Sequence, residues 1–296
     1  MSGGCEPLLA GSTVEPVVDR ASWSPDGGSL VFAAKTRGEA GSDLYVLDSD
    51  RRRLRRLTHL ARASHPVWSP DGSSIVFSVA RRRGIDVAHH LMQIGPDGSD
   101  LRELTPPVDG QVDEAGSFTH SGDRLAFTRW RRVADAADRL RNTASILLIS
   151  PQGGPVEQLE RRGQDPVFSP DGRRVAYVSD RARNGVLRYG SGEFFANELY
   201  IADHDGRRAR RLTRSRSRNE RYPAWAPGGR LLAYQRGEVT GNAAASAILL
   251  ISPAGTCRRV LLADGDLSPS YSEPVWRPTS ARLRLTRTCR RLAARP

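Results

Sequence analysis

One phrase recurs along the chain and constrains its fold more than any other feature. An aromatic residue followed by Ser-Pro-Asp-Gly occupies 23–27, 68–72 and 168–172, and looser copies begin at Phe118, Trp225 and Trp276. The six aromatic positions are separated by 45, 50, 50, 57 and 51 residues, so the repeats extend over nearly all of the 296-residue chain. Self-similarity at such a period is typical of repeat architectures, in which each unit needs its neighbours to bury its apolar faces.

Each repeat has the pattern of four short β-strands. Pro-Asp-Gly turns the chain after the first strand, because proline presets φ, aspartate accepts local hydrogen bonds and glycine adopts the left-handed conformation. Runs of β-branched, aliphatic and aromatic residues, such as 30–32 and 75–77, supply the second strand. A third apolar run and a fourth strand that ends in Leu-Thr, as at 57–58 and 104–105, complete the unit.

These repeats predict an all-β fold, a six-bladed β-propeller of four-stranded antiparallel blades. We expect a single domain over 1–296, with blades anchored near Trp23, Trp68, Phe118, Phe168, Trp225 and Trp276. The tail after 285 lacks a clean apolar run, and an open sheet edge would template aggregation. The segment 7–10 has the phase of a fourth strand, so we expect it to complete blade six; the alternative is that both chain ends fray.

Composition narrows the classes of partner. Apolar runs such as 146–149 are far shorter than the roughly 20 residues of a membrane-spanning helix, so no membrane span is expected. Three widely spaced cysteines exclude a disulfide framework. The net charge of +12 is almost all arginine, since Lys35 is the only lysine. This bias favours an arginine-skewed solvated surface over a nucleic-acid partner, with an electrostatic binding face as the alternative.

The loops between second and third strands are where the repeats differ. Residues 35–42, 80–89, 129–144, 179–197 and 235–246 vary in length, whereas the Pro-Asp-Gly rim stays short. Variable loops on one rim of a rigid scaffold usually carry binding specificity. We therefore expect partner contacts on this face; solvated loops are the alternative. The candidates there are the basic residues Arg81, Arg82 and Arg83, with further arginines at 129, 131, 132, 181, 183 and 188, and the aromatic residues Phe194 and Phe195.

A second group of candidates lies three residues before each anchoring aromatic, or next to that position. Strand direction places these residues around the central channel, on the loop-rich face. They predict a site for a peptide tail or a small polar ligand; paired charges along a water-filled channel are the alternative. The partner-binding candidates in this group are His65, Glu114, Asp165, Arg221, Tyr222 and Glu273, and Arg20 and Ala115 hold the same position in their repeats.

Signals of catalysis are poor. The chain has no G-x-S-x-G elbow, no H-E-x-x-H helix motif and no phosphate-binding loop, and its six histidines show no ligand spacing. We therefore predict no catalytic, cofactor-binding or metal-binding residues, and no cofactor. A lyase or hydrolase that acts at the channel mouth is the alternative, with His65, Glu114, Asp165 or Glu273 as acid or base.

The succession of Trp-Ser-Pro-Asp-Gly, an apolar strand, Leu-Tyr-Val-x-Asp and Leu-Thr resembles the WD-like repeats of TolB-type β-propellers over nearly the whole chain. Similar repeats occur in propellers of prolyl-oligopeptidase relatives and tricorn proteases. The resemblance implies a non-catalytic, monomeric scaffold that binds a protein or peptide through its loop-rich face. Residues 1–20 lack an export signal, which indicates the cytoplasm. TolB-type relatives are exported, so a periplasmic or secreted location is the alternative if the true start lies upstream.

Overall fold

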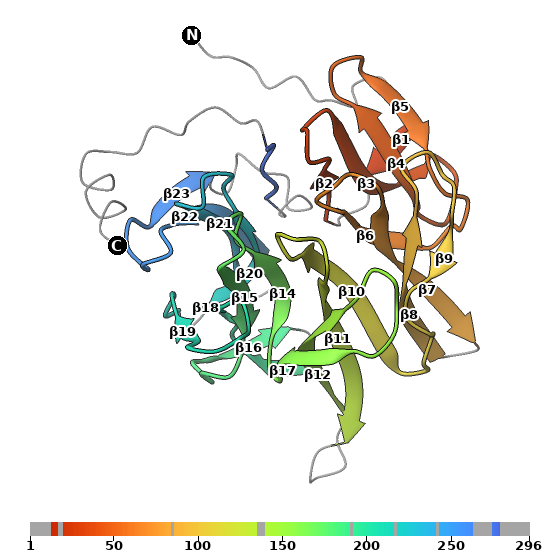
Figure 1. Cartoon of the computed structure of the whole chain (residues 1–296). Helices are drawn as coiled ribbons and strands as arrows, with labels where there is room; N and C mark the ends of the chain where they lie inside the picture. The colour runs from red at the N-terminus through yellow and green to blue at the C-terminus, as the bar shows by residue number, and fades with distance from the viewer. Residues whose placement is uncertain are drawn as a thin grey trace.

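The computed structural model describes residues 13–16, 20–83, 86–134, 140–189, 192–215, 218–240, 243–262 and 274–278. Their regular structure is all β-strand, so the all-β prediction is confirmed. No helix occurs among these residues, and hence none that could span a membrane. Five four-stranded antiparallel units lie side by side around a centre, and β2, β6, β10, β14 and β20 are the innermost strands (Figure 1).

The first two sheets follow the predicted strand succession. Sheet one contains β2 (Ser22–Trp23), β3 (Ser29–Thr36), β4 (Asp43–Asp48) and β5 (Arg53–Arg56), and β1 (Val14–Pro16) pairs with the far half of β3. Sheet two contains β6 (Ala63–Trp68), β7 (Ile75–Arg83), β8 (Asp86–Ile94) and β9 (Arg102–Glu103). A single parallel bridge between His89 and Val112 joins sheet two to sheet three.

Sheets three to five repeat the arrangement. Sheet three contains β10 (Gln111–Phe118), β11 (Leu125–Ala134), β12 (Leu140–Ile149) and β13 (Glu157–Glu160). Sheet four contains β14 (Gln164–Phe168), β15 (Arg174–Ser179), β18 (Glu198–Asp203) and β19 (Arg210–Arg211), with a separate hairpin of β16 (Val186–Tyr189) and β17 (Gly192–Phe195). Sheet five contains β20 (Arg218–Trp225), β21 (Leu232–Thr240), β22 (Ala243–Ile251) and β23 (Arg259–Leu262).

The Ser-Pro-Asp-Gly turns are held by their own side chains. Ser24 Oγ donates to Asp26 Oδ1 at 2.5 Å and accepts the amide of Ser29 at 2.9 Å. Gly27 has a φ of 72°, the left-handed conformation that the turn requires. The equivalent residues at 69–74 and 169–174 make the same bonds. The repeated phrase is therefore a self-contained turn, which is why it recurs with so little change.

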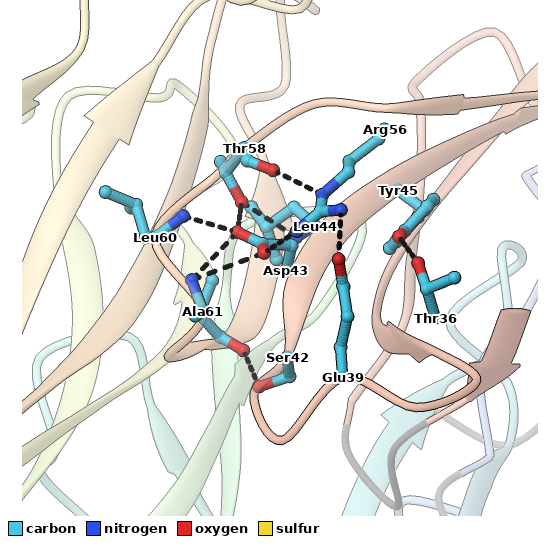
Figure 2. Close-up of polar contacts among 11 residues, drawn as sticks. Thr36, Glu39, Ser42, Asp43, Leu44, Tyr45, Arg56, Thr58, Leu60 and Ala61 are labelled. Carbon is cyan, nitrogen blue, oxygen red and sulfur yellow. Dashed lines mark hydrogen bonds and ion pairs between the residues drawn. The ribbon is translucent and has the colours of Figure 1, made fainter.

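The repeated Leu-Thr at the end of the fourth strand has an equally local role. Thr58 Oγ1 accepts the amide of Leu44 at 2.9 Å and donates to the buried Asp43 Oδ1 at 2.7 Å (Figure 2). Asp43 also accepts from the Leu60 and Ala61 amides and from Arg56 Nη2 (Figure 2). The carboxylate thus ties β4 and β5 to the segment that leads into sheet two. The threonines at 105 and 213 accept the equivalent amides at 2.9 Å.

The core lies between neighbouring sheets. Because successive residues of a strand point to opposite faces, each sheet can bury both faces against its neighbours. Val31 and Leu44 of sheet one pack in one buried cluster with Ile75 and Phe77 of sheet two. Further clusters join sheets two and three, three and four, and four and five. Full burial of such side chains contributes about 1.5–3 kcal/mol each, so sheet stacking is the main stabilising term.

Residues 274–278, called here the bridging segment, contact both the first sheet and the fifth. Trp276 packs against the cluster that contains Leu231 of sheet five. Arg277 Nε donates to the carbonyl of Gly27 at 2.8 Å, and its Cζ lies 5.1 Å from the ring centre of Trp23 in sheet one. The dark blue piece in Figure 1 lies accordingly between the two sheets. The expected strand at 7–10 and the tail after 278 lie outside the described residues.

Three of the segments predicted as variable loops are strands instead. β7 and β8 pair as far as Arg83 and Asp86, β11 and β12 as far as Ala134 and Leu140, and β21 and β22 as far as Thr240 and Ala243. The loop prediction was therefore wrong for the described residues of 80–89, 129–144 and 235–246. Their polar composition indicated loops, but each pair of segments continues its hairpin past the fourth strand of its sheet. We call these extensions the arms.

The arms define one rim of the molecule. β6 begins at Ala63, which pairs with Val79, so the rest of β7 extends past the start of the innermost strand. The Ser-Pro-Asp-Gly turns follow the other end of that strand, after Trp68. The rim with the arms is called the arm rim, and the opposite one the turn rim.

Candidate functional site at the arm rim

The innermost strands share a β-bulge close to the position where the sequence predicted a polar ring. Register shifts occur at 64–67, 115–117, 164–167 and 221–224. Within these bulges His65, Asp165 and Tyr222 have φ values of 49°, 55° and 51°. Left-handed backbone in such residues is unfavourable, and bulges of this kind often re-aim side chains near functional sites. Each of the three residues precedes a proline, a signal that the sequence already contained.

Arg20, Asp165 and Tyr222 meet across the centre of the molecule. Arg20 Nη2 lies 3.7 Å from Asp165 Oδ1, and Arg20 Nη1 donates to the carbonyl of Gly116 at 3.2 Å. The Tyr222 amide donates to Asp165 Oδ2 at 3.2 Å. The side chains of Arg20 and Asp165 are only 11% and 8% exposed, so solvent screens this ion pair little. A residue that leads into sheet one and a residue of sheet five therefore meet on the Asp165 carboxylate of sheet four, and Arg20 also binds the backbone of sheet three.

His65 and Glu114 lie in a second part of the ring, near His89 of β8. Glu114 Oε2 accepts a hydrogen bond from Trp130 Nε1 at 2.9 Å. Burial lowers the pKa of His89 below its usual value; His65 lowers that pKa further, whereas Glu114 opposes the shift. His89 is therefore neutral near pH 7, and its imidazole offers hydrogen bonds without charge. Among the residues that the structure describes, no three His, Cys, Asp or Glu side chains are grouped to hold a metal ion.

The remaining ring candidates are placed as follows. Arg221 stacks on the adjacent Tyr222, with its Cζ 4.5 Å from the ring centre, and both side chains are half-buried. This pair presents a flat cation-aromatic surface next to Asp165. Glu273 lies outside the described residues.

The candidates on the arms are placed apart from the ring. Arg81 is exposed near the base of the first arm, and Arg82 and Arg83 follow it along β7 to the arm tip. Phe194 and Phe195 lie in β17, where Arg183 Cζ is 5.5 Å from the Phe195 ring centre. The structure therefore divides the predicted site into a central ring and outlying hairpins.

Two arginines that the sequence assigned to the basic face are internal instead. Arg129 binds the buried Asp113 through Nε at 2.7 Å and Nη2 at 2.8 Å. Arg181 binds Glu160 at 2.9 Å and stacks 4.1 Å from the ring centre of Tyr200. Both guanidinium groups are neutralised within the fold, and the Arg129 side chain is only 11% exposed, whereas that of Arg181 is 30% exposed.

A third internal ion pair had not been foreseen. Glu220 and Arg236 are buried cross-strand partners in sheet five, with Arg236 Nη2 2.9 Å from Glu220 Oε1. They are 16 residues apart, as are Asp113 and Arg129. The shared spacing of 16 residues between an acidic residue and an arginine could have predicted both cross-strand ion pairs from the sequence.

Comparison with known proteins identifies the family to which this architecture belongs. The profile of the TolB beta propeller domain matches residues 12–189, which is more than half of the chain. The chain belongs to the TolB β-propeller family. The resemblance inferred from the repeats is thereby confirmed. No curated protein sequence is detectably similar to this TolB-family chain.

Solved structures support the same fold for the TolB-family chain. A TolB-like protein from Agrobacterium tumefaciens is 17% identical, with a TM-score of 0.66, and the match covers 88% of this chain and 86% of that one. TolB from Acinetobacter baumannii is 19% identical, with a TM-score of 0.61, over 86% of this chain and 56% of that one. An oligogalacturonate lyase in complex with manganese is 15% identical, with a TM-score of 0.54, over 85% and 66%. At these identities the likeness establishes the fold alone.

Proposed function

We propose that this TolB-family propeller is a non-catalytic scaffold that binds a protein or peptide partner at its arm rim. The observation that carries the proposal is the position of the bulged ring around Asp165, in the half of the innermost strands that faces the arms. A partner seated over the centre would contact polar groups of several sheets, while the arms reach its flanks. Rigid sheets with distinct hairpins on one rim suit recognition rather than bond-breaking chemistry.

The stacked Arg221 and Tyr222 are the best anchor for such a partner. Arginine and tyrosine are enriched among the residues that dominate binding energy at interfaces. The adjacent Asp165 is already engaged by Arg20 and by the Tyr222 amide, which holds this part of the ring in one arrangement. A pre-ordered anchor loses little conformational entropy when a partner binds.

The architecture that accompanies this proposal is one domain with six blades. Trp276 supports the sixth blade, because its indole binds the carbonyl of Ala224 just as Trp225 binds that of Val167. Val260, Leu261 and Leu262 of β23 are exposed on both faces of sheet five. A sixth blade packed against this sheet would cover part of this apolar surface. The segments at 7–10 and 283–285 are the proposed strands of that neighbour. A crystal structure with two separate bodies, or with five closed blades, would refute this part.

A lyase or hydrolase at the channel mouth remains the second candidate. It is favoured by the fold shared with an oligogalacturonate lyase that binds manganese. The described residues offer it no group of three metal-binding side chains, and Glu114 is held by Trp130. Measured turnover on a panel of polysaccharides and lactones, together with the metal content of the purified chain, distinguishes this candidate from the scaffold.

The scaffold proposal is tested by selecting binders from a displayed random-peptide library and mapping the best one. Hydrogen exchange should slow at 63–67, 111–116, 164–166 and 218–223, and stay unchanged at the turns 24–28, 69–73 and 169–173. Arg221→Ala should weaken the selected peptide by about tenfold, which corresponds to roughly 1.4 kcal/mol. Arg230→Ala, an exposed arginine of the turn rim, is the matched control and should have no effect. Protection confined to the turn rim would refute the proposal.

A further inference from the structure

We propose that the arm rim recognises an acidic, extended polypeptide segment through exposed arginines that make no ion pair with the described residues. The inference rests on the proposed function and adds the chemistry of the partner. Its starting point is the clustering of these arginines beside open strand edges.

The arm rim carries six arginines that lack an ion-pair partner in the part of the chain that the structure describes. All of them are exposed, and no ion pair joins any of them to another residue of the described part of the chain. Three of them lie on the arm strands β7 and β11, and three lie in the connections between consecutive sheets. They are Arg81, Arg131 and Arg132 on the arms, and Arg62, Arg161 and Arg214 in the connections.

Several acidic residues near this rim are neutralised by arginines, whereas the exposed Asp109 and the ring residue Glu114 make no ion pair within the described part of the chain. Asp113 and Glu220 are buried against arginines, as described above, and Asp43 accepts from Arg56 at 2.7 Å. Asp180 accepts from Arg162 at 2.9 Å. Each pair cancels one positive and one negative charge. The six arginines outnumber the two carboxylates that make no ion pair, and the excess of positive charge on the described part of the arm rim would attract an acidic partner and accelerate its association.

The turn rim carries a mixture of exposed arginines and ionised aspartates. Two of its exposed arginines have acidic neighbours, since Arg51 lies 3.7 Å from Asp48 and Arg208 lies 3.5 Å from Asp203. Arg53, Arg173 and Arg230 are exposed there without an ion pair among the described residues. The turn aspartates add negative charge, because hydrogen bonds from serine hydroxyls lower the pKa of Asp26 and Asp71 and keep both ionised.

The arms also provide main-chain groups for an extended segment. β12 pairs with β13 only through 146–148, and β22 pairs with β23 only through 248–250. The arm halves of both strands therefore lack an outer neighbouring strand among the described residues. An extended peptide can add to such an edge as a further strand, and arginines beside it would select acidic side chains. Arginines could equally protect these edges from self-association, which the experiment distinguishes.

A nucleic acid is disfavoured by the same surface. Single strands are bound by stacking bases on exposed aromatic rings, together with contacts to phosphate. The large exposed apolar side chains of the described residues are all leucine or valine. The described part of the arm rim thus offers charge and strand edges, with the half-buried Arg221 and Tyr222 as a stacking surface in the ring but no exposed aromatic ring on the arms.

The test measures fluorescence anisotropy of the full chain with three labelled probes. One peptide, about 12 residues long, alternates glutamate with valine, the second replaces glutamate by glutamine, and the third probe is an oligothymidylate of similar length. We expect the glutamate peptide to bind at least about tenfold more tightly than either other probe. Its affinity should fall as salt rises from about 50 to about 200 mM, because salt screens exposed charges.

Two triple variants with the same change in net charge locate the site. Arg81→Ala, Arg131→Ala and Arg132→Ala together should weaken the glutamate peptide by about tenfold or more. Arg53→Ala, Arg173→Ala and Arg230→Ala together remove three exposed arginines from the turn rim and should weaken it less than about twofold.

Several outcomes would overturn the inference. Tighter binding of oligothymidylate would indicate a nucleic-acid surface, and equal losses in both triple variants would indicate non-specific charge attraction. The arm variant could bind the glutamate peptide as the wild type does and yet self-associate, as measured by light scattering. That result would show that the arginines protect the strand edges and do not bind the peptide. Equal binding of the glutamate and glutamine peptides would refute acidic selectivity while leaving the scaffold proposal intact. No peptide binding, together with failure of the library selection, would refute both.

Discussion

Trp276 donates a hydrogen bond from its indole Nε1 to the carbonyl oxygen of Ala224 at 3.1 Å. Trp225 donates the same bond, at the same distance, to Val167 of sheet four. In both cases the acceptor immediately precedes the anchoring aromatic of the preceding repeat. The bridging segment is therefore docked on sheet five in the way that sheet five is docked on sheet four.

Removing this indole should loosen the bridging segment. We expect Trp276→Phe to lower the free energy of unfolding by about 1 kcal/mol, since one hydrogen bond is lost while most of the ring remains. Trp276→Ala should lower it by about 2 kcal/mol, because packing against sheet five is lost as well. Urea denaturation measures both changes. An unchanged free energy of unfolding in Trp276→Ala would show that the contact between Trp276 and sheet five does not stabilise the protein.

The ion pair between Asp113 and Arg129 predicts a large and non-additive effect. Arg129→Met leaves the carboxylate of Asp113 buried without its guanidinium, so unfolding should become easier by about 3–5 kcal/mol. Adding Asp113→Leu should restore part of that loss, because no buried charge then remains. The free energies of unfolding of the wild type, the single variants and the double variant, measured by chemical denaturation, form a double-mutant cycle that tests this non-additivity.

A surface pair is the control for this cycle. The Arg51 side chain is 83% exposed beside Asp48, so Arg51→Ala should change stability by less than about 0.5 kcal/mol. Equal losses at both pairs would contradict the role of burial.

Gly116 is required by close packing at the centre of the molecule. A Cβ at this position would lie 2.7 Å from the carbonyl oxygen of Ala126 and 2.7 Å from Pro166 Cγ. Backbone cannot yield as a flexible side chain does, so Gly116→Ala should destabilise by about 2 kcal/mol or more. Gly228→Ala meets nothing within 4 Å and should leave the melting temperature nearly unchanged. Similar melting temperatures for the two variants would contradict the packing.

Stability should fall in mild acid because of His89 and His90. Burial lowers the pKa of both side chains below the ordinary value of 6.5. Below about pH 6.5 the unfolded chain therefore binds more protons than the folded one. Their contribution is complete above about pH 6.5 and is lost as the pH falls through the lowered pKa values, by at most about 1.4 kcal/mol per pH unit and group.

The measurement is the melting temperature between about pH 5 and pH 8. His90→Gln should flatten the curve below about pH 6.5, because one of the two titrating groups is gone. A melting temperature that rises as the pH is lowered through this range would have the wrong sign and would refute the assignment.

Several arginines show where reasoning from the sequence stopped. Charged side chains in the outer strands of a sheet commonly protect its edge from pairing with another sheet. Instead Arg55 Nη2 donates to the carbonyl of Pro96 at 2.5 Å, and Arg210 donates to that of Pro253, so each joins its sheet to the next one. Arg129 was expected in a loop and is a buried strand residue. The position of an arginine in the repeat did not reveal its partner, because that partner belongs to another strand or sheet.

The amino-acid sequence alone determined the strands, the turns and the family of this protein. Their causes are local: Ser24, Asp26 and Gly27 complete a turn within a few residues, and Thr58 completes its bonds within one sheet. Only the tertiary structure decided that Arg20 meets Asp165, that Arg129 is neutralised and that the arms are strands. Those features depend on contacts between distant segments, whose charges and hydrogen bonds pair only after the sheets have packed.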